Sequence, residues 1–284
     1  MIPRRFFLFW SADKLSYLRF LCLKSIRHFH PDWQIDLFLQ RPKDAEKTWL
    51  GDGKQDFHVY EGKDYLPFLK DLRINVIPVE GELSRLLDDK APVHSSDIFR
   101  FQELHKNGGI YVDTDTLFTG PIDDLYDVVK DKDAVITYSV AQGFQIGFLA
   151  ASPGSEFFKE LLASSHGGFK PEHYQSCGTD ALYLLLDPGC DPHNSFRLLS
   201  ARYDQVLVDR FPNSCIVPSE TLYPYNCDVI PSIFEGEDRE IPQYCVHLFG
   251  GHPLFQEYNS KLTPDNAHEF DGFVFWVIRE IGLV

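Results

Sequence analysis

Two aspartates separated by one residue close an apolar run in the stretch Ile110-Tyr111-Val112-Asp113-Thr114-Asp115. The apolar residues predict a strand, and in an extended chain the side chains at i and i+2 point to the same side. Paired carboxylates suit a hard divalent cation, and Mg²⁺ usually shares its ligand shell with substrate phosphates. Open α/β sheets also bind ligands at the carboxyl ends of their strands. Taken alone, this short and frequent pattern favours a turn with two solvated aspartates.

A second pair of charged residues precedes this run. The sequence predicts a helix from Ser95, and residues three apart on a helix are neighbours, so Asp97 and Arg100 share a face. A surface ion pair of this kind contributes little to stability. The rigid fork of donors on Arg100 also suits sugar or phosphate oxygens. Spacing alone leaves both interpretations open.

The elements around these residues alternate between strand and helix, which favours an α/β fold. A strand over 6–10, a helix that Pro31 ends and a strand over 35–39 form a βαβ unit with parallel strands and a right-handed crossover. Further strands are expected over 110–112, 135–140, 146–150 and 244–249. Helices are expected over 95–107, over 153–163 with Ser152 as the cap, over 179–186 and from Thr263 to about Ile281. The charged, glycine-containing stretch 41–90 predicts surface loops and short helices.

In context, the motif resembles a known family. The run Ser96-Asp97-Ile98-Phe99-Arg100, then Leu104, then Gly108 to Asp115 resembles the DXD glycosyltransferases of the yeast initiating mannosyltransferase and α-galactosyltransferase type (glycosyltransferase family 32-like). The clostridial glucosylating toxins share this core pattern. Looser matches are Ile2-Pro3 followed by Trp10, Gln145 to Ala150, and Val246-His247, so the resemblance covers residues 2 to about 252.

The resemblance implies a GT-A-like fold with a mostly parallel central sheet flanked by helices, a nucleotide-diphosphate sugar as donor, Mn²⁺ or Mg²⁺, and retention at the anomeric carbon. It makes Trp10, Asp97, Arg100, Tyr111 and Asp113 donor-binding residues. Trp10 would stack on the nucleobase, although an aromatic residue in an apolar run is also typical of core packing. Tyr111 is either an inward-facing core residue or a hydroxyl near the donor.

The metal is assigned to Asp113, Asp115 and His247, because neutral imidazole is a common metal ligand. A hydrogen-bonded histidine at a strand end is the competing interpretation of His247. Asp115, Asp180 and Gln145 are assigned to catalysis, although Gln145 departs from the Asn of the resembled family and Asp180 also suits the first turn of a helix. Replacement of Asp115 by Asn should lower turnover rather than stability, since it relieves repulsion in an acidic cluster.

Composition limits the partners. The chain has 284 residues, 44% of them hydrophobic, which is enough for one GT-A-like domain over 1–284, with a donor part to about 150 and an acceptor part from about 151. A formal charge of −15 argues against nucleic acid as a partner. The six cysteines contain no C-x-x-C pair, and we expect reduced thiols in a cytoplasmic protein. No transmembrane segment is predicted, and peripheral membrane contact stays compatible with the sequence.

The expected function is transfer of a hexose from a UDP- or GDP-sugar to a glycan or glycolipid acceptor. Two alternatives remain open. A phosphohydrolase of the haloacid dehalogenase type also has an apolar strand before D-x-D, with Asp113 as nucleophile and Asp115 as acid-base. That family places its motif near the N-terminus, whereas a βαβ unit precedes it here. A non-catalytic nucleotide-sugar-binding protein on the same fold is the second alternative.

Overall fold

The computed structural model describes residues 1–41, 60–88, 90–192 and 200–284. The strands are β1 (Arg5–Trp10), β2 (Gln34–Leu39), β3 (Asn75–Pro78), β4 (Gly109–Val112), β5 (Thr116–Phe118), β6 (Ala134–Ser139), β7 (Gly143–Ala151), β8 (Ser214–Pro218) and β9 (Cys245–His247). The α-helices are α1 (Tyr17–Phe29), α2 (Gly81–Leu87), α3 (Pro92–Asn107), α4 (Asp123–Val129), α5 (Glu156–Gly167), α6 (Thr179–Leu186), α7 (Ser200–Arg210), α8 (Ser219–Leu222), α9 (Ile230–Glu235), α10 (Pro253–Lys261) and α11 (Phe273–Glu280). Short 3₁₀ turns are η1 (Leu66–Leu72), η3 (Cys227–Val229) and η4 (Ala267–Glu269).

A central sheet of seven strands in the order β3-β2-β1-β4-β7-β6-β8 organises the described chain. Strands β3, β2, β1 and β4 pair in parallel, and β6 pairs in parallel with β8. Strand β7 is antiparallel to both β4 and β6, so it runs against the other strands of this sheet. A separate antiparallel pair joins β5 to β9. The predicted α/β fold with a mostly parallel central sheet flanked by helices is confirmed.

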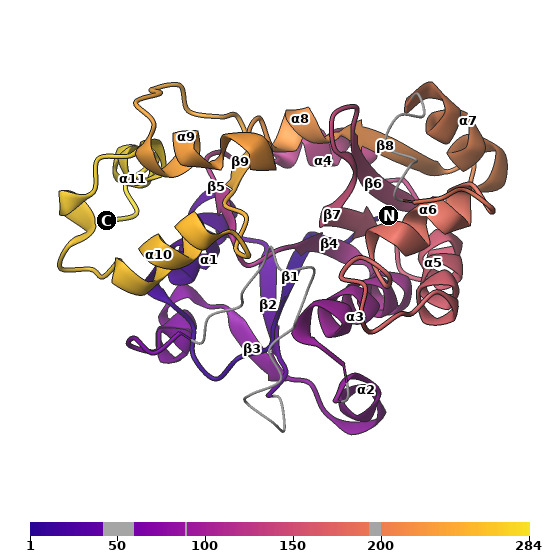
Figure 1. The fold of residues 1–284 in the computed structure, drawn as a ribbon, viewed down its shortest axis with the longest axis horizontal. Helices are drawn as coiled ribbons and strands as arrows, with labels where there is room; N and C mark the ends of the chain where they lie inside the picture. Colours follow the sequence, from indigo (N-terminus) through magenta and orange to yellow (C-terminus); the bar gives the residue numbers. More distant parts are fainter. Residues whose placement is uncertain (42–59, 89, 193–199) are drawn as a thin grey trace.

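The sheet is buried on both faces. Alternate residues of β1 enter different clusters: Phe7 packs with α3, α5 and α6, whereas Phe6 and Leu8 pack with α1. Figure 1 shows α3, α5 and α6 together on one side of the molecule and α1 with α10 on the other. A third cluster packs α1 against β9 and the C-terminal helices. The C-terminal segment is thereby placed next to the strand ends of the N-terminal half.

The predicted βαβ unit is present, with β1 and β2 parallel and in register from Arg5 to Trp10. Ser16 caps α1 by accepting a hydrogen bond from the backbone of Arg19, and the helix ends at Phe29, two residues before Pro31. Within the stretch 41–90, residues 42–59 and 89 lie outside the described residues. The rest contains η1 and α2 as expected, and also the edge strand β3, which the charged composition did not suggest.

Two helices begin at residues other than those predicted. Helix α3 begins earlier, at Pro92, because proline fits the first helical position, and Ser95 lies inside the helix and donates to the carbonyl of Leu87. Helix α5 is capped by Ser155, whereas the hydroxyl of Ser152 donates to Lys132.

The helix expected from Thr263 to about Ile281 begins later, as α11 at Phe273, and the preceding helix α10 ends at Lys261. Between them Thr263 and Asn266 bond each other through side chain and backbone, so the local turn replaces a helical start. The late strand is also shorter than predicted, since β9 ends at His247. No helix in the described part of the chain combines the length and hydropathy that a membrane span requires.

Candidate active site

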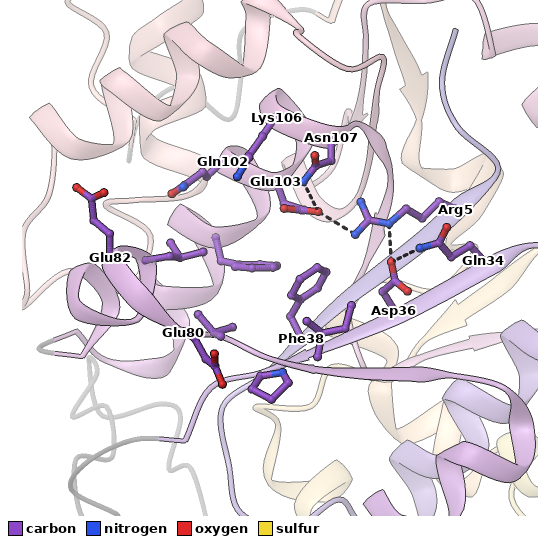
Figure 2. Close-up of a pocket in the computed structure, with 15 residues that line it drawn as sticks. Arg5, Gln34, Asp36, Phe38, Glu80, Glu82, Gln102, Glu103, Lys106 and Asn107 are labelled. Atoms are coloured by element: carbon purple, nitrogen blue, oxygen red, sulfur yellow. Dashed lines mark hydrogen bonds and ion pairs between the residues drawn. The ribbon is translucent and has the colours of Figure 1, made fainter.

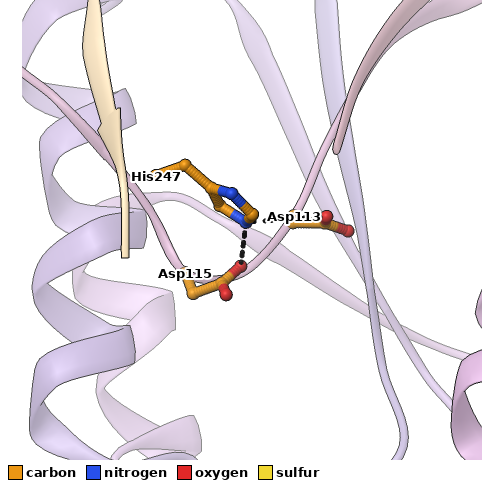
Figure 3. Close-up of side chains that lie close together, drawn as sticks. All are labelled: Asp113, Asp115 and His247. Atoms are coloured by element: carbon orange, nitrogen blue, oxygen red, sulfur yellow. Dashed lines mark ion pairs between the residues drawn. The ribbon is translucent and has the colours of Figure 1, made fainter. Parts of the chain in front are cut away.

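Asp113 and Asp115 lie in a turn that joins β4 to β5. The backbone N–H of Thr116 donates to the carbonyl of Asp113 at 3.1 Å, which closes the turn. The sequence prediction of an extended segment is therefore wrong at this point. One carboxylate oxygen of each aspartate still lies close to His247, and Figure 3 shows the two aspartates on different sides of the imidazole ring.

His247 reaches this turn through the small sheet. Strand β9 pairs with β5 so that His247 lies opposite Thr116, directly after the aspartates. Phe249 then adopts a left-handed backbone with φ of 53°, a conformation that is uncommon for a residue other than glycine. The next residue, Gly250, donates its N–H to the carboxylate of Asp115.

The three side chains form what we call the Asp–His cluster: Asp113, Asp115 and His247. Nε2 of His247 lies 3.5 Å from Oδ1 of Asp115 and 4.0 Å from Oδ2 of Asp113. One ligand atom from each residue lies within 4.8 Å of the others, a spacing that one metal ion can bridge. Two carboxylates and one imidazole are also a chemically suitable ligand set for a divalent cation.

The surroundings of Asp115 favour its ionised form. Burial raises the pKa of a carboxyl group, but nearby His247 and Arg19 and the N–H of Gly250 outweigh this effect and hold the pKa of Asp115 well below its usual range. Burial likewise lowers the pKa of His247, and Asp115 and Asp113 together raise it above its ordinary value. Asp115 and His247 therefore each favour the charged form of the other.

Asp113 is fixed by residues that the sequence analysis assigned to the donor. The hydroxyl of Tyr111 donates to Oδ1 of Asp113 at 2.7 Å, and Nη1 of Arg100 lies 3.5 Å from the same oxygen. The guanidinium of Arg100 also covers the ring of Tyr111 at 4.3 Å. Oδ2 of Asp113 points toward His247, and the backbone of Gly147 lies against it, where a Cβ would approach to 2.8 Å.

Asp97 and Arg100 are buried rather than exposed, so the interpretation as a surface ion pair is wrong. Oδ1 of Asp97 lies 3.2 Å from Nη2 of Arg100, yet it accepts no hydrogen bond from any described residue. Burial raises the pKa of Asp97 to about 7, against the influence of Arg100 and with help from Asp113 and Asp180. Gly178 packs so closely on this carboxylate that a Cβ there would lie 2.5 Å from Oδ2. Asp97 is thus a buried acid with an unfilled acceptor, a feature typical of functional sites.

The remaining assigned residues differ in their positions. Trp10 is partly exposed at the carboxyl end of β1, where the guanidinium of Arg19 covers its ring at 4.7 Å. Asp180 lies in the first turn of α6, near Asp97. Gln145 lies in β7, and no hydrogen bond or ion pair among the described residues joins its side chain to the Asp–His cluster. The carbonyl of its neighbour Ile146 instead accepts a hydrogen bond from Arg100 at 2.8 Å.

The sequence analysis missed two residues of this region. Arg19 reaches the DXD turn from α1, and its sequence signal is a charge beside Leu18 and Cys22 on the apolar face of a helix. The ring of Tyr223 packs on His247 with centroids 5.4 Å apart. No motif marks this tyrosine, because only the folded chain brings the segment after β8 to β9.

A pocket of about 700 Å³ lies elsewhere, between α2, α3 and the strands β2 and β3 (Figure 2). At one side is a group that we call the Arg5 network: Arg5, Gln34, Asp36, Asn75, Glu103 and Asn107. Arg5 bonds Asp36 at 2.6 Å and Glu103 at 2.8 Å. Gln34 and Asn75 complete the bonding of Asp36, and Asn107 donates to Glu103. This network lies at the amino ends of β1 and β2, away from the Asp–His cluster.

Comparison with known protein families gives a match that includes the two aspartates of the Asp–His cluster. Residues 19–133 match the family described as "Glycosyltransferase sugar-binding region containing DXD motif". Asp97, Arg100, Tyr111, Asp113 and Asp115 all fall within this region. The match confirms the predicted enzyme class, a glycosyltransferase, and the D-x-D motif as part of its sugar-binding region. No curated protein of similar sequence was found.

Solved glycosyltransferase structures resemble the chain loosely. PaToxG glycosyltransferase has 14% sequence identity and a TM-score of 0.42, with 99% of this chain and 87% of that one covered. The apo form of the glycosyltransferase GlyE of Streptococcus pneumoniae TIGR4 has 15% identity and a TM-score of 0.48, with 99% and 60% covered. The galactosyltransferase LgtC, in complex with donor and acceptor sugar analogs, has 12% identity and a TM-score of 0.38, with 92% and 84% covered.

Proposed function

We propose that the protein is a retaining, metal-dependent hexosyltransferase that moves a hexose from a UDP- or GDP-sugar to a glycan or glycolipid acceptor. The observation that carries this proposal is the convergence of Asp113 and Asp115 with His247, beside the buried Asp97–Arg100 pair. The family match over residues 19–133 supports transfer from a sugar donor. Retention, the donor base and the acceptor class rest on the resemblance of the motif.

Asp113, Asp115 and His247 would hold the divalent cation. The mixed oxygen and nitrogen set favours Mn²⁺ over Mg²⁺, because Mg²⁺ in proteins is bound mainly by oxygen. When bound, the cation supplies positive charge that stabilises the leaving diphosphate more in the transition state than in the ground state. The turn contributes by keeping Asp115 in an environment that favours its ionised form and by holding both carboxylates close to His247.

The donor sugar and nucleotide would lie across the carboxyl ends of β1 and β4. Trp10 offers a partly exposed ring for the nucleobase, a contact of about 1–3 kcal/mol in other base-stacking sites. Asp97 has an acceptor free for a sugar or ribose hydroxyl, and Arg100, already bonded to the carbonyl of Ile146, supplies a positive charge beside it. The hydroxyl of Tyr111 orients Asp113 by donating a hydrogen bond to its carboxylate.

The acceptor side is assigned to the second half of the domain. Asp180 lies near Asp97 at the start of α6, and its carboxylate is suited to an acceptor or donor hydroxyl. Gln145 is retained as a donor-sugar contact through its longer side chain. We keep the division into a donor part to about residue 150 and an acceptor part beyond it as part of the proposal, together with a cytoplasmic location.

A thermal-shift panel of nucleotide sugars with and without Mn²⁺ tests this function, since a ligand that binds the native state raises the melting temperature by mass action. We expect one UDP- or GDP-hexose to stand out, and only when Mn²⁺ is present. The anomeric configuration of the sugar first released by donor hydrolysis then tests retention. A panel without any Mn²⁺-dependent shift would contradict the proposal.

The same preparation separates the alternatives. A phosphohydrolase would release phosphate from a generic phosphate ester and lose that activity in Asp113→Asn. A binding protein would bind the donor but leave it intact during long incubation. Hydrolysis of the sugar–phosphate bond, without release from the generic ester, favours the transferase over both.

A further inference from the structure

Arg19 is a buried charged residue with no role in the sequence assignments. It lies in the first turn of α1 and is only 9% exposed. Its Nη1 donates to the hydroxyl of Thr114, the middle residue of the D-x-D turn, at 2.7 Å. Thr114 is itself buried, so this hydrogen bond is shielded from solvent.

Two aromatic rings enclose the same guanidinium. Its central carbon lies 4.7 Å from the ring centroid of Trp10 and 4.9 Å from that of Phe255. Cation–π contacts are stronger when they are desolvated, so two rings around one buried guanidinium restrict the side chain to one orientation. Phe255 belongs to α10, and the contact therefore joins the C-terminal segment to β1 and α1.

The backbone of Gly250 closes the arrangement. A Cβ at this position would overlap the guanidinium of Arg19 and would lie 2.7 Å from Oδ2 of Asp115. A side chain at this position would therefore have to displace Arg19 and Asp115. Arg19 thus contacts the D-x-D turn, the expected nucleobase platform and the segment that carries His247.

We propose that Arg19 is a positioning residue that fixes the D-x-D turn, the ring of Trp10 and the Gly250 segment in one arrangement before metal and donor bind. The assignment rests on the proposed function of the Asp–His cluster. No ion pair among the described residues joins Arg19 to either aspartate within 4.0 Å, so its direct contacts with the turn are the hydrogen bond to Thr114 and packing. In other metal sites, mutation of a residue that orients a metal ligand typically lowers metal affinity about 10–100-fold. We expect a loss of about 10-fold here.

Arginine suits this position better than lysine. A planar guanidinium can stack between two rings while its edge donates to Thr114, whereas an ammonium has no plane and a different reach. Arg19→Lys should therefore keep the charge but lose part of the positioning. Arg19→Met removes the charge and keeps most of the volume, and Thr114→Val removes only the acceptor.

The test measures Mn²⁺ affinity by calorimetry, without nucleotide, beside the melting temperature. We expect Mn²⁺ binding to weaken about 10-fold in both Arg19→Met and Thr114→Val, and by less in Arg19→Lys. The double variant should bind about as weakly as Arg19→Met alone, because the hydrogen bond that Thr114→Val removes is already lost in Arg19→Met. Effects that multiply in the double variant would overturn a route through Thr114.

Arg27→Met is the matched control on the same helix. Arg27 donates to backbone carbonyls near η1 and β2, including those of Leu72 and Trp33, and not to the D-x-D turn. This variant should lose stability and keep wild-type Mn²⁺ affinity. Equal Mn²⁺ affinity in wild type, Arg19→Met and Thr114→Val would overturn the positioning role alone. Failure of the wild type to bind Mn²⁺ would overturn the metal site and the Arg19 assignment with it.

Discussion

The two ends of the parallel strands carry buried charges in different ways. At the amino ends, both oxygens of Asp36 accept hydrogen bonds, from Arg5 and Gln34 on one and from Asn75 on the other. At the carboxyl ends, Oδ1 of Asp97 accepts none from the described residues, and three ligand atoms of the Asp–His cluster face one point. The first arrangement is complete without a ligand, whereas the second has acceptors left for one. Buried charge alone therefore does not mark the site, but incomplete pairing does.

Removal of Arg5 should produce the largest effect on stability. Arg5→Met leaves Asp36 and Glu103 buried without their cation, and breaking a buried ion pair on one side costs about 3–5 kcal/mol. Urea unfolding without metal measures this loss. If the variant unfolds at room temperature, Asn75→Leu removes one bond of the same network and should cost less. If both variants are as stable as the wild type, the Arg5 network does not stabilise the fold, and the contrast between the two ends of the strands is wrong.

Asp115→Asn should show the opposite balance. We expect donor hydrolysis to fall at least about 100-fold, in line with loss of one strong electrostatic contact in a preorganised site. Stability should fall modestly, by about 1 kcal/mol, because the structure surrounds Asp115 with His247, Arg19 and the N–H of Gly250. This revises the expectation from sequence, in which repulsion alone decided the sign. Near wild-type turnover would show that the metal site lies elsewhere.

Gly178→Ala tests the packing on Asp97. The added methyl would meet Oδ2 of Asp97 at 2.5 Å and Cδ1 of Ile146 at 2.6 Å, and overpacking of this kind costs about 1–3 kcal/mol. Gly167→Ala is the control, since a Cβ there meets nothing within 4 Å. Donor affinity should fall in Gly178→Ala and remain unchanged in Gly167→Ala. Equal stability of the two variants would mean that Asp97 can move away freely.

Asp97→Asn should stabilise the protein at a pH above the raised pKa of Asp97. Because the pKa of Asp97 is raised to about 7, the native state binds more protons than the unfolded state between about pH 4 and 7. Wild-type stability should thus fall as pH rises through this window, and Asp97→Asn, which cannot ionise, should remove that fall. Unfolding at pH 5 and pH 8 without metal measures it. If Asp97→Asn is less stable than the wild type at pH 8, Asp97 is a fully paired structural carboxylate, like Asp36 in the Arg5 network.

Local sequence determined much of this protein. The apolar run before Asp113, the i, i+3 spacing of Asp97 and Arg100, and the βαβ pattern of the first 39 residues depend on neighbours in the chain, and these predictions agree with β1, α1, β2, α3 and β4. The prediction was wrong where a local turn competed with a helix, as at Thr263. There, side-chain bonds to the backbone outweighed helical propensity.

The tertiary structure decided what the site contains. His247 joins the aspartates because β9 pairs with β5, and Gly250 bonds Asp115 across 135 residues of sequence. The burial of Asp97, which raises its pKa, comes from Gly178 and α6, and Arg19 becomes a neighbour of the D-x-D turn only when α1 packs on β5. Spacing in sequence sets which side chains share a face, because backbone geometry is local. Which faces meet depends on long-range packing, and a motif of three residues holds no information about its partners.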